Sequence, residues 1–487
     1  MVCTFAAKAV GAFYRLPLTN LLGATGIGYY QLVFPIYALV LALTSSAIPV
    51  LLARQIAKET RFGYAVFYRA MRLMALVGGV GALLLLALAY PLALAQGADA
   101  MAWMYVAVAP AVLAVALSSV YRGWFAANLH TGVLAGMTLV EQVVKLSGLA
   151  FAYLLSARGT VPAVVGALLG VTLAEVGAWL WCVVAYIALG YRFGRPETVV
   201  PMRPIWRATL PITAANMIMP VVTGVDSLLL VNLSVWAGQP RTDAVSDYGL
   251  LTGAVGTLTS MPVVLTLAFV TLIVPVVSRA VQARQADTVR NRSADTLWVV
   301  FAISLPCAVG MAMLAPQLMA LLYPRLTPAQ HDYAAQLLPV AAVGVPILAM
   351  QQVYNALLQA VERSVTGARH MLVGGGVKLL LDVALVPLWG MMGAVVANVA
   401  CYAVVGVLHY ASYRHLTGRY DLGRPLWGAA LGAACMAATM WSLVRLVHNN
   451  TWCVVLNILL GGGVYAIIWW CVYGAHWWQN HRADARE

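Results

Sequence analysis

The 487-residue chain has few charged residues. Asp, Glu, Lys and Arg make up 9% of it, against an apolar share of 62% and a mean hydropathy of +0.85. Polar stretches are also short, since the longest connection between two apolar stretches is 190–207. A separate soluble domain between the apolar stretches is therefore excluded, and the composition is typical of a membrane protein.

The chain also lacks any grouping of cysteines or compact patch of charge. The seven cysteines lie singly inside apolar stretches, and no two have metal-ligand or disulfide-framework spacing. Acidic residues number 16 against 29 basic ones, for a net charge of +13. The basic residues flank the apolar stretches without forming a compact patch, so nucleic-acid binding has no support.

Fourteen apolar stretches dominate what is there. A bilayer core about 30 Å thick requires about 20 apolar residues per helix. The sequence therefore predicts an all-α membrane protein with fourteen transmembrane helices, at 2–22, 28–53, 73–95, 101–121, 134–156, 162–189, 208–235, 248–277, 294–322, 333–360, 370–388, 390–413, 426–447 and 452–474.

The basic residues between these helices lie mostly on one side. Connections after even-numbered helices, together with the tail, contain 21 of them, and connections after odd-numbered helices contain 4. The positive-inside rule then predicts that both termini are cytoplasmic.

The chain contains a weak internal repeat. The stretch 248–279 echoes 28–54, and two single residues, Tyr121 with Tyr354 and Lys145 with Lys378, match at the same offset. We therefore predict two pseudo-symmetric six-helix lobes, 1–190 and 191–413, followed by 414–487 with two extra helices and a tail. Parallel repeats with an even helix count are typical of transporters that hold the substrate between the halves.

Ionisable residues inside apolar stretches are costly and usually face an interior path or pair with each other. In the first half these are Lys8 and Arg15 on helix one, Glu141 with Lys145 on helix five and Glu175 on helix six, while Arg122 ends helix four. Basic groups in a desolvated cavity favour a polyanion such as a lipid diphosphate. The alternatives are snorkelling for Lys8 and Arg15, a positive-inside role for Arg122, and mutual neutralisation of Glu141 and Lys145 four residues apart.

A second group of ionisable residues lies in the other half. Asp226 is on helix seven, Lys378 and Asp382 are four apart on helix eleven, and Asn398 on helix twelve is a polar neighbour. These residues could form a closed ion cluster, or a cation or proton site in which the lysine competes with the ion. Sodium would favour the carboxylate and carbonyl oxygens.

Several segments resemble one family. The stretch KAVGAFYRLPLTNLLGATGIGYYQLVFPIYALVLALTSSAIPVLLARQIAKE (8–59) looks like the opening of stage V sporulation protein B and its polysaccharide-biosynthesis relatives. The segments 121–145, 272–279 and 376–387 are also similar to that family. These proteins are grouped with MurJ-like lipid II flippases, O-antigen-type flippases and the multidrug and toxin extruders.

The resemblance implies two six-helix lobes in a V, with two added helices that would guide a polyprenyl tail. It implies that the chain moves an undecaprenyl-diphosphate-linked saccharide across a bacterial cytoplasmic membrane by alternating access, as a monomer without a cofactor and with Na⁺ or H⁺ as candidate coupling ions. By resemblance Lys8 and Arg15 would serve the substrate. Asp226, Asp382 and Asn398 would correspond to a cation site, in which Lys378 replaces an expected neutral amide.

The sequence departs from the family's pattern at three places, and each departure weakens the assignment of one of the family's properties to this chain. Only seven residues precede Lys8, the segment after Arg122 reads Gly-Trp-Phe where the family has glutamine-glycine, and helix eight lacks a basic residue. The last departure weakens lipid II itself as the substrate.

Two other functions compete with the flippase. A cation-coupled drug antiporter would favour an acidic, aromatic cavity, whereas the first half is net basic. An enzyme acting on lipid-linked sugars would require a catalytic acid or base on a surface loop, for which the connection 236–247, with Asp243 and Asp247, is the best candidate.

Overall fold

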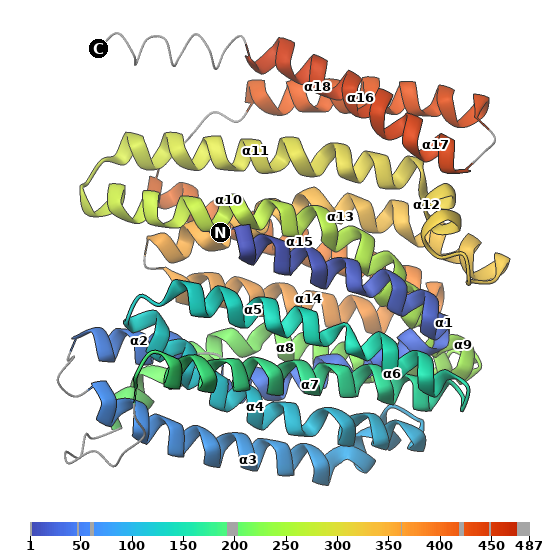
Figure 1. Cartoon of the computed structure of the whole chain (residues 1–487). Helices are drawn as coiled ribbons and strands as arrows, with labels where there is room; N and C mark the ends of the chain where they lie inside the picture. The colour runs from blue at the N-terminus through green and yellow to red at the C-terminus, as the bar shows by residue number, and fades with distance from the viewer. Residues whose placement is uncertain are drawn as a thin grey trace. The chain divides into compact units, whose positions relative to one another are not determined.

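The structure, a computed structural model, describes residues 2–45, 48–58, 63–191, 203–361, 363–417, 423–447 and 450–474 (Figure 1). Every regular element in these ranges is a helix, which confirms the predicted all-α membrane class. The helices are α1 (Val2–Ser45), α2 (Ile48–Lys58), α3 (Gly63–Ala95), η2 (Asp99–Met101), α4 (Ala102–Ala127), α5 (Thr131–Lys145), α6 (Ser147–Ser156), α7 (Thr160–Ala188), α8 (Arg203–Trp236), α9 (Arg241–Gly249), η3 (Leu250–Val255), α10 (Gly256–Gln282), α11 (Ala286–Met313), α12 (Ala315–Leu322), α13 (Pro328–Ala360), α14 (Ser364–Trp389), α15 (Met391–Thr417), α16 (Gly423–Leu446), α17 (Asn450–Leu456), η4 (Asn457–Gly461), α18 (Gly462–Trp469) and η5 (Trp470–Gly474).

Thirteen stretches of the described residues are long and apolar enough to span a membrane. The first of them, Phe13–Ala57, has 45 residues and is about twice the length that one crossing requires. Within it α1 breaks at Gly23, whose φ of 68° and ψ of 178° are readily available only to glycine. The break falls between the predicted helices 2–22 and 28–53, so the structure agrees with fourteen crossings.

One predicted boundary is wrong. The connection 236–247 was expected to be an outer loop, yet α9 already begins at Arg241 and continues through the π-helical segment η3 into α10. Pro240 precedes the helix and Asp243 lies in its first turn, and both are features of a helix N-terminus. Asp243 and Asp247 are therefore helical residues and do not belong to a surface loop.

The chain divides into two compact units, Met1–Gly249 and Leu250–Glu487. In the first unit α8 and α9 pack against α1, in addition to the bundle of α3, α4 and α7 (Figure 1). The predicted lobe boundaries at 190 and 413 come from the internal repeat and stay predictions.

Small residues allow the helices to approach closely, as packing in lipid requires. Gly148 of α6 lies against Gly170 of α7, and a Cβ on either residue would collide with the other helix. Gly28 of α1 meets the Val245 carbonyl of α9 in the same way. These contacts leave no room for a larger side chain.

Each unit has an aromatic cluster around one of the two matched tyrosines. Tyr121 lies 5.4 Å from Phe67 and 5.7 Å from Tyr186, measured between ring centroids. Tyr354 lies 5.9 Å from Tyr410 in the second unit. Tyr121 and Tyr354 are both 3% exposed. The internal repeat therefore places two buried tyrosines in comparable surroundings.

The helices α16 and α18 pack against each other, and α16 also packs against α11. Tyr465 of α18 donates a hydrogen bond of 2.7 Å to the Ala302 carbonyl of α11. The Trp298 and Trp469 rings lie 5.5 Å apart. The last helix pair is thus anchored on α11 within the second unit.

A polar network joins five helices of the first unit. Buried Gln96, which follows α3, donates to the Leu32 carbonyl of α1 at 2.9 Å and accepts from the Tyr105 hydroxyl of α4 at 2.7 Å. Arg241 of α9 donates to the Gln96 carbonyl at 2.9 Å and to Asn232 of α8. The hydrogen bonds connect helix ends that are far apart in the sequence.

We expect Gln96→Ala to lower the free energy of unfolding by about 2–3 kcal/mol, because the Tyr105 hydroxyl would be left buried without a partner and the Leu32 carbonyl would lose a donor. Equilibrium unfolding in mixed micelles measures this change. Gln336→Ala, at an exposed glutamine of α13, is the control and should change the value by less than about 0.5 kcal/mol. Equal effects of the two substitutions would contradict the role of the network.

Candidate functional site

Lys145 lies in the last turn of α5 and faces aromatic rings of α1. Its Nζ is 5.4 Å from the Tyr14 ring centroid and 5.9 Å from the Phe34 ring centroid. Both distances are within the range of a cation–π interaction. Within the described residues Lys145 has no carboxylate within 4.0 Å, so it forms no direct ion pair with Glu141, although the Glu141 charge still acts on it.

Glu141 instead turns toward Arg122 of α4. The Arg122 Nη2 and Glu141 Oε2 atoms are 3.7 Å apart, and the side chains are 40% and 23% exposed. Gln142 Nε2 also donates to Glu141 Oε1 at 3.1 Å. The buried Nε of Arg122 has no hydrogen-bond partner in the described part of the chain. The structure thus brings Arg122, which could have been a simple helix-end charge, beside a predicted site residue.

Arg15 and Glu175 complete the charged group. Both are half-buried, and both lie close enough for their charges to act on Lys145. We call Arg15, Arg122, Lys145, Glu141 and Glu175 the basic site. Three basic and two acidic side chains leave it with one positive charge in excess when all are ionised. A partly buried excess of positive charge favours binding of an anion.

Lys8 is the remaining basic residue predicted for this site. It belongs to α1, seven residues before Arg15, but its side chain lies outside those that the structure describes. Its role stays a prediction.

The sequence did not single out the phenols near the basic site. The buried hydroxyls of Tyr14 and Tyr37 have no hydrogen-bond partner among the described residues. Glu141 and Glu175 lie close enough to Tyr37 for their charges to act on it. Two buried donors without partners are suited to bind acceptor oxygens of a ligand. The position of Tyr14 next to Arg15 was the available signal, but tyrosines in apolar helices are usually core residues.

The second predicted pair, Lys378 and Asp382, forms a direct ion pair. Lys378 Nζ and Asp382 Oδ2 are 2.7 Å apart on α14, and the side chains are 5% and 0% exposed. Asn398 is half-buried on α15, which packs against α14. Asp226, 8% exposed on α8, belongs to the first unit, where its charge acts on Tyr248. The grouping of Asp226 with the other three residues stays a prediction.

No cluster of three or more His, Cys, Asp or Glu side chains suited to a metal ion occurs in the described ranges. The closed Lys378–Asp382 pair has the lysine ammonium where a metal cation would otherwise lie. The geometry of this pair therefore favours an ion pair over a sodium site.

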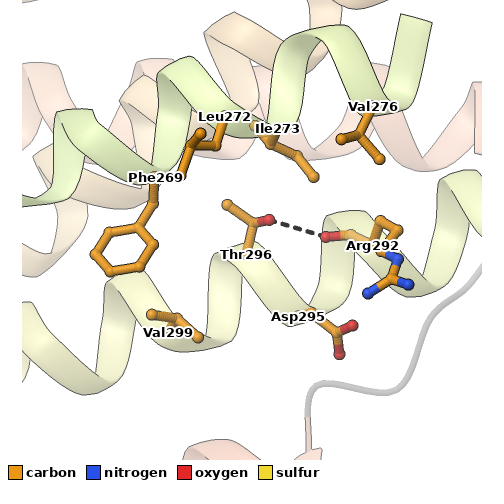
Figure 2. A pocket seen from close by; sticks show the side chains of 8 residues that line it. All are labelled: Phe269, Leu272, Ile273, Val276, Arg292, Asp295, Thr296 and Val299. Carbon is orange, nitrogen blue, oxygen red and sulfur yellow. Dashed lines mark hydrogen bonds between the residues drawn. The ribbon is translucent and has the colours of Figure 1, made fainter. Parts of the chain in front are cut away.

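A groove of about 370 Å³ lies between α10 and α11 in the second unit (Figure 2). One part of its wall is apolar and the other carries the charged Arg292 and Asp295, as Figure 2 shows. The Thr296 hydroxyl donates to the Arg292 carbonyl at 2.9 Å. The tail groove was expected on the last two helices, whereas this groove lies on α10 and the neighbouring α11. It is lined by Phe269, Leu272, Ile273, Val276, Arg292, Asp295, Thr296 and Val299.

Two family models match the chain. One is described as polysaccharide biosynthesis protein and covers residues 1–281, and the other, MatE, covers residues 211–384. Stage V sporulation protein B of Bacillus subtilis (strain 168) is 25% identical over 424 residues, which span 83% of this chain and 80% of the relative. Lipid II flippase MurJ of the same organism is 23% identical over 429 residues, with coverage of 82% and 78%.

The fold is also that of a solved transporter structure. Lipid II flippase MurJ in an inward closed conformation superposes with a TM-score of 0.79 at 13% identity, covering 97% of this chain and 98% of that one. At this identity the likeness shows the fold alone, that of a multi-pass membrane transporter.

Proposed function

Because the chain belongs to the polysaccharide biosynthesis protein family, we propose that it is a flippase for a polyprenyl-diphosphate-linked saccharide. The substrate would pass from the cytoplasmic to the outer leaflet of a bacterial cytoplasmic membrane by alternating access. The name of one relative, lipid II flippase MurJ, supports a lipid-linked precursor as the class of transported molecule. No chemical bond is made or broken in this process, so the protein would not be an enzyme.

The basic site is the observation that carries the proposal. A diphosphate has several acceptor oxygens and at least two negative charges, which suit the Arg15, Arg122 and Lys145 side chains. Arginine supplies paired donors in a fixed plane, whereas lysine supplies a point charge. Tyr14 and Tyr37 would add neutral donors. A cationic drug would be repelled by the excess positive charge, which disfavours a drug antiporter.

Glu141 and Glu175 have a separate role in this mechanism. The Glu141 carboxylate pairs with the Arg122 guanidinium, with Oε2 and Nη2 3.7 Å apart. When a diphosphate binds, Arg122 would exchange this long contact for the ligand. The carboxylates would then compete with the substrate and promote its release on the other side, because a site that holds a polyanion too tightly cannot turn over.

The groove between α10 and α11 would hold part of the polyprenyl chain. Its apolar wall matches hydrocarbon, and two of its lining residues, Phe269 and Leu272, are 37% and 48% exposed. Arg292 would remain near the phosphate level at the cytoplasmic face, where the positive-inside rule places it.

The MatE family model matches residues 211–384, and MatE relatives are ion-coupled transporters. The proposed cycle is therefore coupled to an ion, with Na⁺ and H⁺ as the candidates. We propose that the protein works as a monomer with both termini in the cytoplasm. A cysteine-accessibility experiment on residues near either terminus of the chain tests the orientation.

Reconstitution into vesicles tests the function. The purified protein is placed in liposomes with a fluorescent undecaprenyl-diphosphate disaccharide and without any sugar acceptor. We expect the labelled lipid to become accessible to a membrane-impermeant quencher only when the protein is present. Accumulation of a lipid-linked precursor on the cytoplasmic side in cells depleted of the protein would identify the glycan.

The same vesicles separate the alternatives. Uptake of an organic cation driven by an ion gradient, without movement of the labelled lipid, would support a drug antiporter. A new lipid product formed after addition of a second sugar donor would support an enzyme. Movement of the lipid alone, as we expect, excludes both.

Filling the groove tests its role. Val299→Trp places an indole in the groove between α10 and α11, and we expect it to lower the flipping rate about tenfold, the equivalent of about 1.4 kcal/mol. Leu380→Trp adds the same ring at a residue that is 73% exposed on α14 and serves as the matched control. An unchanged rate in Val299→Trp would show that the chain lies elsewhere.

A further inference from the structure

Two histidines face each other inside the second unit. His370 lies on α14 and His409 on α15, with ring centroids 5.1 Å apart and an angle of 52° between the rings. His409 is 0% exposed, whereas His370 is half-buried. Both residues lie inside stretches that are long and apolar enough to span a membrane, where ionisable residues are candidates for function. Neither residue belongs to the basic site or to the Lys378–Asp382 pair.

The contacts of His409 decide which of its nitrogens carries hydrogen. Its Nε2 lies 3.4 Å from the Gly367 carbonyl oxygen, which can only accept a hydrogen bond. Nε2 is therefore the donor, and Nδ1 of the neutral ring has a lone pair. Nδ1 is buried and has no partner among the described residues at the distance and angle of a hydrogen bond. The backbone of Gln351 on α13 nevertheless lies close enough to act on the ring. His409 is thus a basic group in the protein interior with backbone groups of two neighbouring helices beside it.

His370 has a similar arrangement. Its Nε2 is 3.3 Å from the Ser412 hydroxyl oxygen, and its Nδ1 is buried without a partner in the described part of the chain. Two adjacent imidazoles cannot both be cationic at low cost, because like charges at this distance repel. The pair would therefore bind one additional proton, and that proton would make either ring cationic but not both.

The charged groups around the pair provide no described counter-ion. On α13 and α14 the described acids are Asp332, near the start of α13, and Asp382, which is bound to Lys378. On α11, which also contacts α15, they are Asp287 and Asp295. Asp382 is twelve residues from His370, or about 18 Å along the helix. Arg369 on α14 and Arg363, which precedes α14, are exposed. The remaining titratable groups nearby, on α13 and α15, are Tyr354, Tyr410, Tyr413, Arg414 and His415.

Three helices meet at this point. A Cβ on Gly367 would lie 2.9 Å from Asn355 Oδ1 of α13 and 3.8 Å from His409 Nε2. A positive charge on His409 would therefore appear where α13, α14 and α15 are in close contact. The charge would favour any conformation in which water reaches the pair. Because a ligand shifts the population toward the conformation that binds it better, proton binding would shift the protein toward that hydrated conformation.

We propose that His370 and His409 form an intramembrane proton-binding site whose occupancy drives a conformational step of the flipping cycle. The coupling to flipping rests on the proposed function, whereas proton binding by the pair does not. The ligand is H⁺, and the site is distinct from the carboxylates considered above for a coupling ion.

Two measurements test the proposal on the full chain in nanodiscs and liposomes. Histidine labelled with ¹³C at Cε1 reports protonation by NMR between pH 5 and pH 8, with His370→Gln and His409→Gln assigning the signals. The lipid-flipping rate is then compared at pH 6 and pH 8, and we expect at least a ~5-fold difference that falls below ~2-fold in either variant.

Glutamine is chosen because its side-chain N–H can still donate to the Gly367 carbonyl, so that packing is retained while titration is lost. The thermal unfolding midpoint of each variant checks that it is folded. His331→Gln is the matched control, since His331 of α13 also has Nε2 near a backbone carbonyl, that of Tyr323 at 2.8 Å. The control should keep the pH dependence of the wild type.

The outcomes are distinct. A pair that stays neutral throughout this pH range, with flipping equally pH-dependent in all variants, overturns the proposal. Titration of the pair without any change in the pH dependence of flipping overturns the coupling. Titration of the pair in a protein that moves no lipid supports the proton site and removes the proposed function instead.

Discussion

Lys145→Met lowers the flipping rate about 100-fold if the basic site binds a diphosphate. A charge-assisted hydrogen bond to a buried partner contributes about 3 kcal/mol, and each 1.4 kcal/mol is a factor of ten. Methionine retains the apolar stem that packs near the Tyr14 and Phe34 rings, so the fold should survive. The rate in liposomes and the amount of folded protein in the membrane are the two measurements.

Arg15→Gln should have an effect of similar size, because Arg15 acts on the same site from α1. Arg158→Gln removes a basic residue from an exposed connection and is the matched control, expected to leave the rate unchanged. Full activity in both Lys145→Met and Arg15→Gln would mean that the substrate does not use these charges, and the diphosphate site would be abandoned.

Breaking the Lys378–Asp382 pair should destabilise the protein by about 3–5 kcal/mol in either single variant, because one charge is left buried without its partner. Lys378→Met and Asp382→Leu are the single changes. The double variant, which removes both charges and fills the space with apolar atoms, should recover to within about 1–2 kcal/mol of the wild type. Equilibrium unfolding in mixed micelles gives all three values.

The double variant also decides what the pair does. Retained flipping would show that the ion pair is structural. Loss of flipping in a folded double variant would show that the charges take part in transport, as a cation or proton site would. A double variant that is no more stable than the single variants would contradict the direct pairing at 2.7 Å.

The pairs Glu141/Lys145 and Lys378/Asp382 have the same spacing and lie at matching places in the predicted repeat. In the structure they differ in whether the two side chains bind each other. Glu141 and Lys145 are separated, Glu141 toward Arg122 and Lys145 toward aromatic rings, whereas Lys378 and Asp382 bind each other. Spacing of four residues places two side chains on one helix face but does not exclude a better partner from another helix. Arg122 is such a partner in the first unit.

The helices themselves were predictable because burial in lipid depends on local composition. The break at Gly23 and the boundary at Gly390, which has a φ of 59°, both coincide with predicted ends. The start of the eighth helix was predicted too late because the residues of α9 are polar and do not form an apolar stretch. This helix is stabilised by packing against α1, which the local sequence does not show.

The histidine pair could not have been found from the sequence. His370 and His409 are separated by an entire helical hairpin, and each by itself is typical of a polar residue near a helix end. The same holds for Gln96 and Arg241, whose hydrogen bonds connect segments more than a hundred residues apart.

Span positions and the excess of basic residues on one side are additive properties of single residues in water or lipid, so the order of amino acids was sufficient for both. The choice of partner for each buried charge depends on distances between side chains of different helices. Electrostatic energy in a medium of low dielectric constant changes steeply with those distances. Only the packed bundle therefore shows that Lys145 lies over aromatic rings of another helix, whereas Lys378 pairs with Asp382 of its own helix.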